Sequence, residues 1–166
     1  MPKMTEINKS MTVAGLISSI QPPEKQNDVK KILQVLKKYS KDIHVWGDNI
    51  IGAGKMLYQS KSQKPYTWFQ CGVAPRASNI SVYLGMTPLS SATVAKVGPK
   101  CSHGVGCLYI KSLADVNMKE LEALLKKCFA VKEFVAPGAK PAKPSKPLKP
   151  EGKGAMKVKK RPGKKA

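Results

Sequence analysis

The segment that most constrains the fold is residues 100–128, KCSHGVGCLYIKSLADVNMKELEALLKKC. Residues 107–110 form a short apolar run of strand-favouring residues, and glycines at 104 and 106 indicate a turn just before it. Asn117 followed by Glu120 is typical of a capped helix start, and apolar residues then recur at helical spacing: Leu121, Leu124, Leu125 and Cys128. The segment predicts a turn, a buried strand and a capped helix.

Two amphipathic helices are expected near the N-terminus. Residues 1–11 are polar and predict a flexible segment, after which Thr12 caps a first helix that the prolines at 22 and 23 stop. The second helix has an apolar stripe that faces inward: Val29, Ile32, Leu33 and Leu36. Its lysines at 30, 31, 37 and 38 face outward, and they form either a solvated surface or a surface that meets phosphate.

From Ile43 the pattern changes to short apolar runs separated by glycine, which predict strands joined by tight turns. Residues 67–73 and 79–84 predict two strands of a hairpin, and residues 87–97 predict a brief helix that ends at Gly98. This order favours an α+β domain over residues 12–134, with two layers and a mostly antiparallel central sheet on which the helices pack.

The charge is strongly basic, with a formal net charge of +20. Residues 137–166 contain eleven basic residues and one acidic residue, Glu151, so they carry +10, and the rest of the chain carries the same excess. Charge of this sign favours a polyanionic partner, with nucleic acid first and an anionic membrane second. No stretch has the length of a membrane-spanning helix, and the N-terminus lacks the apolar core of a signal peptide, so we expect an intracellular protein in the cytoplasm, nucleoid or nucleus.

Residues 135–166 predict a disordered, lysine- and proline-rich tail. Lys140, Lys143, Lys146 and Lys149 recur every three residues, and a proline follows each of them. In a polyproline II helix these lysines would share one ridge, roughly 9 Å apart. The bias resembles that of linker-histone tails and predicts nonspecific nucleic-acid contact through Lys140, Lys143, Lys146, Lys149, Lys153, Lys157, Lys159, Lys160, Arg161, Lys164 and Lys165. The alternative is a solubilising or nuclear-targeting tail, for which KVKKRPGKK (157–165) is suited.

The predicted domain contains three distinctive blocks, VWGDNIIGAG (45–54), WFQCGVAPRASNISVYL (68–84) and CLYIKSLADVN (107–117). Together they resemble the YdhG-like family of small α+β domains. The resemblance implies a compact α+β fold with a central antiparallel sheet, in a family mostly of unknown function. One branch is described as a frataxin-like iron chaperone. Where members commonly read G-K-S-C-L, this chain has Val105 in place of the lysine, and the basic tail is not associated with the family's domain.

Other candidate sites have weaker patterns. Cys101, His103 and Cys107 are the only cluster of soft metal ligands, one short of the four that zinc prefers. The same thiols with His103 or His44 would supply a nucleophile and a base, but no third orienting group is evident, so we expect no enzyme and no cofactor. Aromatic residues near the only arginine of the domain form either a ligand groove or part of the core: Trp46, Tyr58, Trp68, Arg76 and Tyr83.

The sequence thus favours a non-enzymatic binding module with a nucleic-acid-binding tail. Two alternatives are an iron or zinc chaperone of the frataxin-like kind, and a small-ligand domain whose tail serves only targeting or solubility. Dispersed carboxylates among many lysines argue against the first alternative, because iron held by oxygen needs clustered acids.

Overall fold

The computed structural model describes residues 3, 5–61, 64–85, 87 and 89–139. The predicted nucleic-acid contacts from Lys140 onward lie outside the described residues. The elements, in chain order, are α1 (Val13–Ser18), α2 (Pro23–Tyr39), β1 (Ile43–Trp46), β2 (Ile50–Ala53), β3 (Met56–Gln59), β4 (Tyr66–Trp68), β5 (Cys71–Pro75), β6 (Ile80–Tyr83), α3 (Ser91–Val97), β7 (Ser102–His103), β8 (Cys107–Ile110), η1 (Leu113–Asp115), α4 (Met118–Ala130) and β9 (Glu133–Val135).

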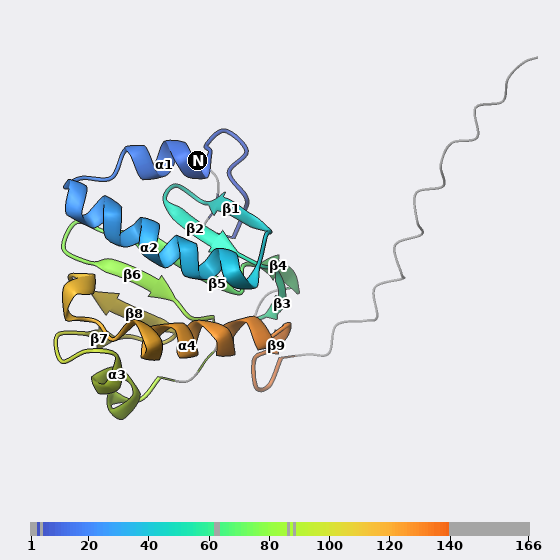
Figure 1. Cartoon of the computed structure of the whole chain (residues 1–166). Helices are drawn as coiled ribbons and strands as arrows, with labels where there is room; N and C mark the ends of the chain where they lie inside the picture. The colour runs from blue at the N-terminus through green and yellow to red at the C-terminus, as the bar shows by residue number, and fades with distance from the viewer. Residues whose placement is uncertain (1–2, 4, 62–63, 86, 88, 140–166) are drawn as a thin grey trace, which may run out of the picture.

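The central layer is a six-stranded antiparallel sheet in the order β1-β2-β5-β6-β8-β7. Helices α2 and α4 cross one face of this sheet (Figure 1). A smaller sheet has the order β4-β3-β9, in which β3 pairs antiparallel with β4 and parallel with β9. The predicted α+β fold with a mostly antiparallel sheet and packed helices is confirmed.

The helix ends follow from side chains that accept orphan backbone N–H groups. Thr12 Oγ1 accepts from Gly15 N at 3.0 Å, and Asn117 Oδ1 accepts from Lys119 N at 3.1 Å, so the predicted side-chain caps at Thr12 and Asn117 are confirmed. The backbone N–H of Asn117 donates to Val97 O at 2.7 Å and not to Glu120. The prolines after α1 also start the next helix, because α2 begins at Pro23. The first position of a helix needs no N–H donor, and proline has none.

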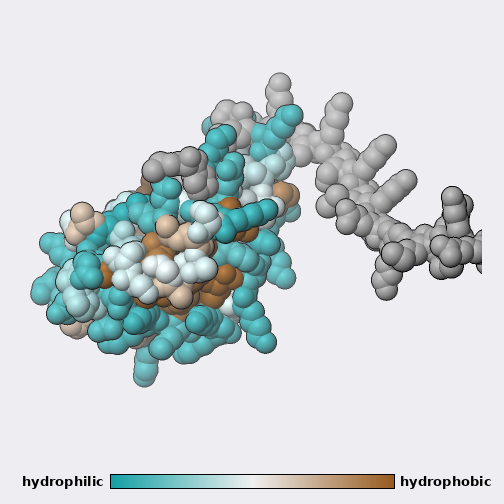
Figure 2. All heavy atoms as spheres, turned by 90° about the horizontal axis from the view of Figure 1, so that it is seen from above, coloured by the Kyte–Doolittle hydropathy of each residue, from teal (hydrophilic) through white to brown (hydrophobic). Residues whose placement is uncertain are grey.

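The main core lies between the helices and the sheet. Its side chains are aliphatic residues and cysteines that are at most 8% exposed, and the predicted inward stripes of α2 and α4 are all among them. Cys71 and Cys128 are buried here as free thiols, whereas Cys101 and Cys107 are half-buried. The end of the molecule that carries α1 is mostly hydrophilic, with less polar residues gathered near the centre of the view (Figure 2).

The predicted hairpin is confirmed, since β5 pairs antiparallel with β6, but its first strand does not run over residues 67–73. The chain bends at Phe69 and Gln70, which places β4 in the small sheet and β5 in the large one. Gln70 accounts for the bend, because its N–H donates to Ala53 O at 3.0 Å and its side-chain amide donates to Val131 O at 2.7 Å. These bonds reach segments far away in the sequence, so local periodicity did not reveal them.

The segment predicted to be flexible, residues 1–11, is attached to the body in part. Ile7 forms an antiparallel bridge with Trp46, and Asn8 is 8% exposed and donates to Gly47 O at 2.9 Å. The body therefore begins before residue 12. The predicted helix over 87–97 begins later than expected, at Ser91, because Ser90 caps it.

No helix among the described residues has the length and apolar character needed to cross a membrane.

Candidate functional site

The face of the large sheet that lies opposite the helices carries aromatic side chains. Trp46, Ile50, Phe69 and Ala74 form a second buried cluster there, with Trp68 and Tyr83 packed against it. Gly52 permits this arrangement, because a Cβ at that position would lie 2.5 Å from Trp46 Cδ1 and 2.7 Å from Phe69 Cβ. The bare backbone at this position lets two large rings lie directly on the sheet.

A hollow of about 250 Å³ opens beside this cluster, between the small sheet and the turn before β8. It is lined by Tyr58, Trp68, Phe69, Tyr83, Gly85, Val105, Gly106 and Cys107. We call it the aromatic groove. Three of the five predicted groove residues, Tyr58, Trp68 and Tyr83, therefore line one cavity. Trp46 does not, because it is 3% exposed and lies edge-on against Phe69.

Arg76, the fifth predicted groove residue, is held beside the groove. Its guanidinium donates to Tyr83 Oη at 2.7 Å and to Asn49 Oδ1 at 3.2 Å. Arg76 follows β5 directly, and its side chain extends back along the sheet to Tyr83, the residue that pairs with Gly72 of β5. A half-buried cation is thus fixed next to the aromatic wall, with Tyr83 as its link to the cavity.

The pKa values of the two half-buried thiols, Cys101 and Cys107, are raised. Burial raises the pKa of Cys107, and the charge of Arg76 and a hydrogen bond from Tyr109 only partly oppose this. Burial and the negative charge of Asp115 raise the pKa of Cys101. The thiolate is the reactive form of cysteine, so raised pKa values keep both side chains in the less reactive state.

The histidines considered as catalytic bases lie in different parts of the sheet. His44 is on β1 and its Nε2 is 2.6 Å from Asp42 Oδ1, whereas β1 and β8 are separated in the sheet by three strands. His103 is on β7, where it pairs with Leu108. The predicted nucleophile and His44 are therefore not brought together.

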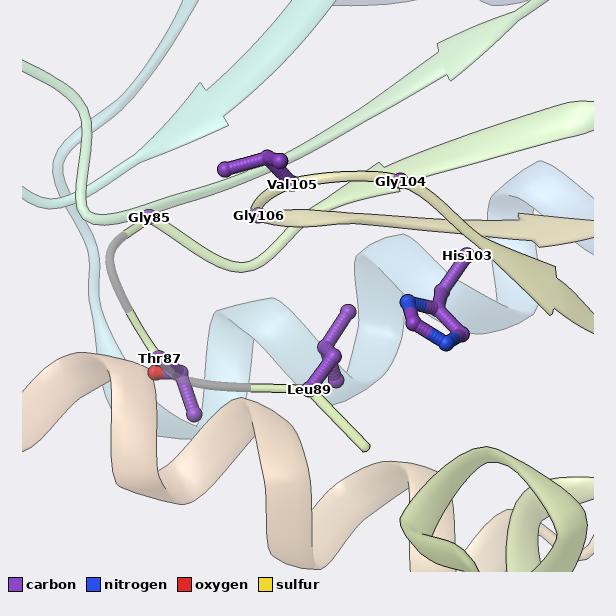
Figure 3. Close-up of a pocket in the computed structure, with 7 residues that line it drawn as sticks. All are labelled: Gly85, Thr87, Leu89, His103, Gly104, Val105 and Gly106. Atoms are coloured by element: carbon purple, nitrogen blue, oxygen red, sulfur yellow. The ribbon is translucent and has the colours of Figure 1, made fainter. Parts of the chain in front are cut away.

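His103 instead faces a second hollow of about 480 Å³ (Figure 3). His103 and Leu89 point into this hollow, and Val105 points away from both of them. Gly85, Val105 and Gly106 line both this hollow and the aromatic groove, so the two hollows are neighbours. Val105 is 96% exposed at the tip of the turn.

The three candidate metal ligands are dispersed. The thiol of Cys101 lies near Gly98, His103 faces the second hollow, and Cys107 lines the aromatic groove. In the part of the chain that the structure describes, no group of three or more His, Cys, Asp or Glu side chains is arranged to hold a metal ion. The iron or zinc hypothesis thus has no site in that part.

Two residues of the aromatic surface were missed from the sequence. Tyr66 and Phe134 flank Tyr58 across the small sheet, with ring centroids 5.2 and 5.3 Å from the Tyr58 ring. Tyr66 and Trp68 do alternate along the sequence as on one face of a strand, which was an available signal. Phe134 gave none, because β9 pairs in parallel with a strand far from it in the sequence.

Comparisons of the chain with models of protein families, with curated proteins and with solved structures found no match in any of the three.

Proposed function

We propose that this protein is a non-enzymatic binding module that acts inside the cell and associates with nucleic acid through residues 140–165, without sequence preference. The observation that carries the proposal is the net charge of +10 on residues 137–166, with lysines every third residue in the proline-rich part. Lysine meets phosphate as a point charge and reads no base edge, so this segment supplies affinity rather than sequence specificity.

The charge distribution of the folded body supports the same proposal. The lysines at 30, 31 and 37 are exposed on α2, and none of them forms an ion pair with another described residue. Lys38 pairs with Glu122 at 3.3 Å, but both groups are at the surface, where such a pair contributes little. The body therefore adds to the positive potential of the chain and does not offset that of residues 140–165.

The YdhG-like assignment of the body is part of the proposal. The blocks that carry the resemblance include β1 and β2, β5 and β6, and β8, which are consecutive neighbours in the large sheet. Blocks that are separate in the sequence thus belong to one structural unit, as expected for the sheet of one family. This supports the assignment of the body and says nothing of its ligand.

A salt titration tests the proposed function. If about eight lysine charges engage duplex phosphates, the logarithm of the association constant should fall against that of the salt concentration with a slope near −7, from about −0.9 per contact. The experiment is filter binding of the full chain to a random-sequence duplex, beside a full-length variant with the eleven basic residues of the tail changed to glutamine. Equal affinity of the two proteins, with the same salt slope, would contradict the proposal.

A second candidate function is the binding of a small planar ligand in the aromatic groove, with the tail serving only targeting or solubility. The cavity lined by Tyr58, Trp68 and Tyr83 favours it. A screen of planar ligands by fluorescence quenching tests it, with Tyr83→Ala as the comparison. A ligand that binds both proteins equally would count against the groove as its site.

A further inference from the structure

One face of the small sheet carries a continuous row of aromatic rings. The pairing register sets Tyr66 opposite Tyr58 in β4 and β3, and Phe134 opposite Tyr58 in β3 and β9. The rings of Tyr58 and Phe134 are stacked, with an interplanar angle of 21°. Trp68 shares this face, because side chains alternate along a strand, and its ring is 5.5 Å from that of Tyr58. We call these four residues the aromatic row.

The aromatic row is only half-buried. The hydrophobic cluster beside it is centred on Phe69, which is 1% exposed, whereas all four rings of the row keep part of their surface accessible. Tyr58 and Trp68 also form one wall of the aromatic groove, which faces Gly106 and Cys107. The groove is smaller than the roughly 300–1,000 Å³ typical of sites for drug-sized ligands, so its size suits one ring system.

Three lysines lie close along the chain to the ends of the strands that carry the aromatic row. Lys61 follows β3, Lys64 precedes β4 and Lys132 precedes β9, and all three side chains are exposed. None of these three lysines forms an ion pair with another residue in the described ranges. Strand β9 then leads through Ala139 to Lys140, the first of the periodic lysines. The rings and the basic segment are therefore adjacent along the chain.

We propose that the aromatic row binds unpaired bases of single-stranded nucleic acid, while Lys61, Lys64 and Lys132 contact its phosphates. This inference rests on the proposed function and specifies the form of nucleic acid that is bound. Bases of a single strand stack on exposed aromatic side chains regardless of sequence, whereas the bases of a duplex are stacked on one another. The groove beside Tyr58 and Trp68 accepts one base, and the rings of Tyr66 and Phe134 extend the stacking surface.

The test compares single-stranded nucleic acid with a duplex, and variants on one face of the small sheet with variants on the other. The full chain is titrated by fluorescence anisotropy with labelled oligo(dT), oligo(rU) and a duplex of equal length at one salt concentration. A Tyr66→Leu, Phe134→Leu double variant should weaken single-strand binding by about 5- to 150-fold for each stacked base that is lost, and leave duplex binding unchanged. The matched control is Leu57→Ala, Thr67→Ala, which alters the other face of the same sheet. This control should bind as the unchanged protein does.

Tryptophan fluorescence gives a second readout that needs no change in the aromatic row. The chain has two tryptophans, and Trp46→Phe leaves Trp68 as the only one. Oligo(dT) or oligo(rU) should quench Trp68 in this variant, and the duplex should not. This measurement decides the matter if the double variant fails to fold.

The outcomes separate the inference from the proposed function. Equal affinity of the chain for single strand and duplex, with no quenching of Trp68, would overturn the role of the aromatic row and leave tail binding intact. Absence of binding to any of the three nucleic acids would overturn both. The role of the aromatic row is also contradicted if the double variant still prefers the single strand to the duplex and the single strand does not quench Trp68 in the Trp46→Phe variant.

Discussion

The two faces of the large sheet are closed in different ways. Under α2 and α4, aliphatic side chains are at most 8% exposed and fill the space between two layers. On the opposite face, buried Trp46 and Phe69 are bordered by half-buried rings, an arginine and a small cavity. The first face stabilises the fold through burial of apolar surface, and the second keeps groups that are able to meet a ligand. The two faces of the large sheet thus differ in packing: one is closed by aliphatic side chains and the other by aromatic rings with a cavity beside them.

The largest effect is expected on the helix-covered face. Leu125 on α4 is 0% exposed, and Leu125→Ala should lower the free energy of unfolding by about 3 kcal/mol, since it loses apolar burial and leaves a cavity. Urea unfolding measures this. Leu57→Ala is the matched control, because Leu57 is 42% exposed and should change stability by less than about 0.5 kcal/mol. Similar losses of unfolding free energy in the two variants would contradict the expectation that the helix-covered core contributes more to stability than the surface of the small sheet.

Gly52→Ala tests whether the aromatic face is closely packed against the sheet. The added Cβ would meet both Trp46 and Phe69, and at least one ring must move. We expect a loss of about 2 kcal/mol in unfolding free energy, as for overpacking of a core. A stability equal to that of the unchanged protein would show that the rings on this face adjust freely, unlike the aliphatic side.

Arg76→Met removes the cation beside the groove while keeping a long side chain. It loses the hydrogen bonds to Tyr83 and Asn49, and we expect a cost of about 1 kcal/mol. The charge of Arg76 favours the thiolate of Cys107, so its loss should raise the pKa of that thiol further. In a Cys101→Ser background, the rate of Cys107 alkylation should therefore shift to higher pH. If the pH dependence of Cys107 alkylation is unchanged, the guanidinium of Arg76 does not influence the pKa of this thiol.

The smallest effect is expected at the outer surface of the helices. The hydroxyl of Tyr39 donates to Glu122 at 2.9 Å, and with Lys38 it lowers the pKa of that carboxyl. Because the folded-state pKa is depressed, the contribution to stability is present above the unfolded pKa and disappears as pH falls through the folded value. Glu122→Gln should slightly reduce the melting temperature at pH 7 and have no effect at pH 2. Tyr39→Phe should reproduce part of this change. If Glu122→Gln has the same melting temperature as the unchanged protein at both pH values, the pair makes no contribution to stability.

The sequence predicted the helix-covered side well because its signals are local. Helix caps, such as Thr12 and Asn117, act within three residues, and the stripes of α2 and α4 follow the helical period. Three of the predicted groove residues also line one cavity. The row of rings was not predicted, since it depends on the parallel pairing of Phe134 with Tyr58 across a large sequence separation.

The sequence by itself determined the α+β class, the inward faces of the two long helices and the basic character of the chain, because each of these depends on composition or on periodicity within one element. Tertiary structure decided which aromatic residues meet, where the chain bends at Gln70, and that the three candidate metal ligands are dispersed. These features arise from contacts between distant segments, whose geometry no local pattern encodes.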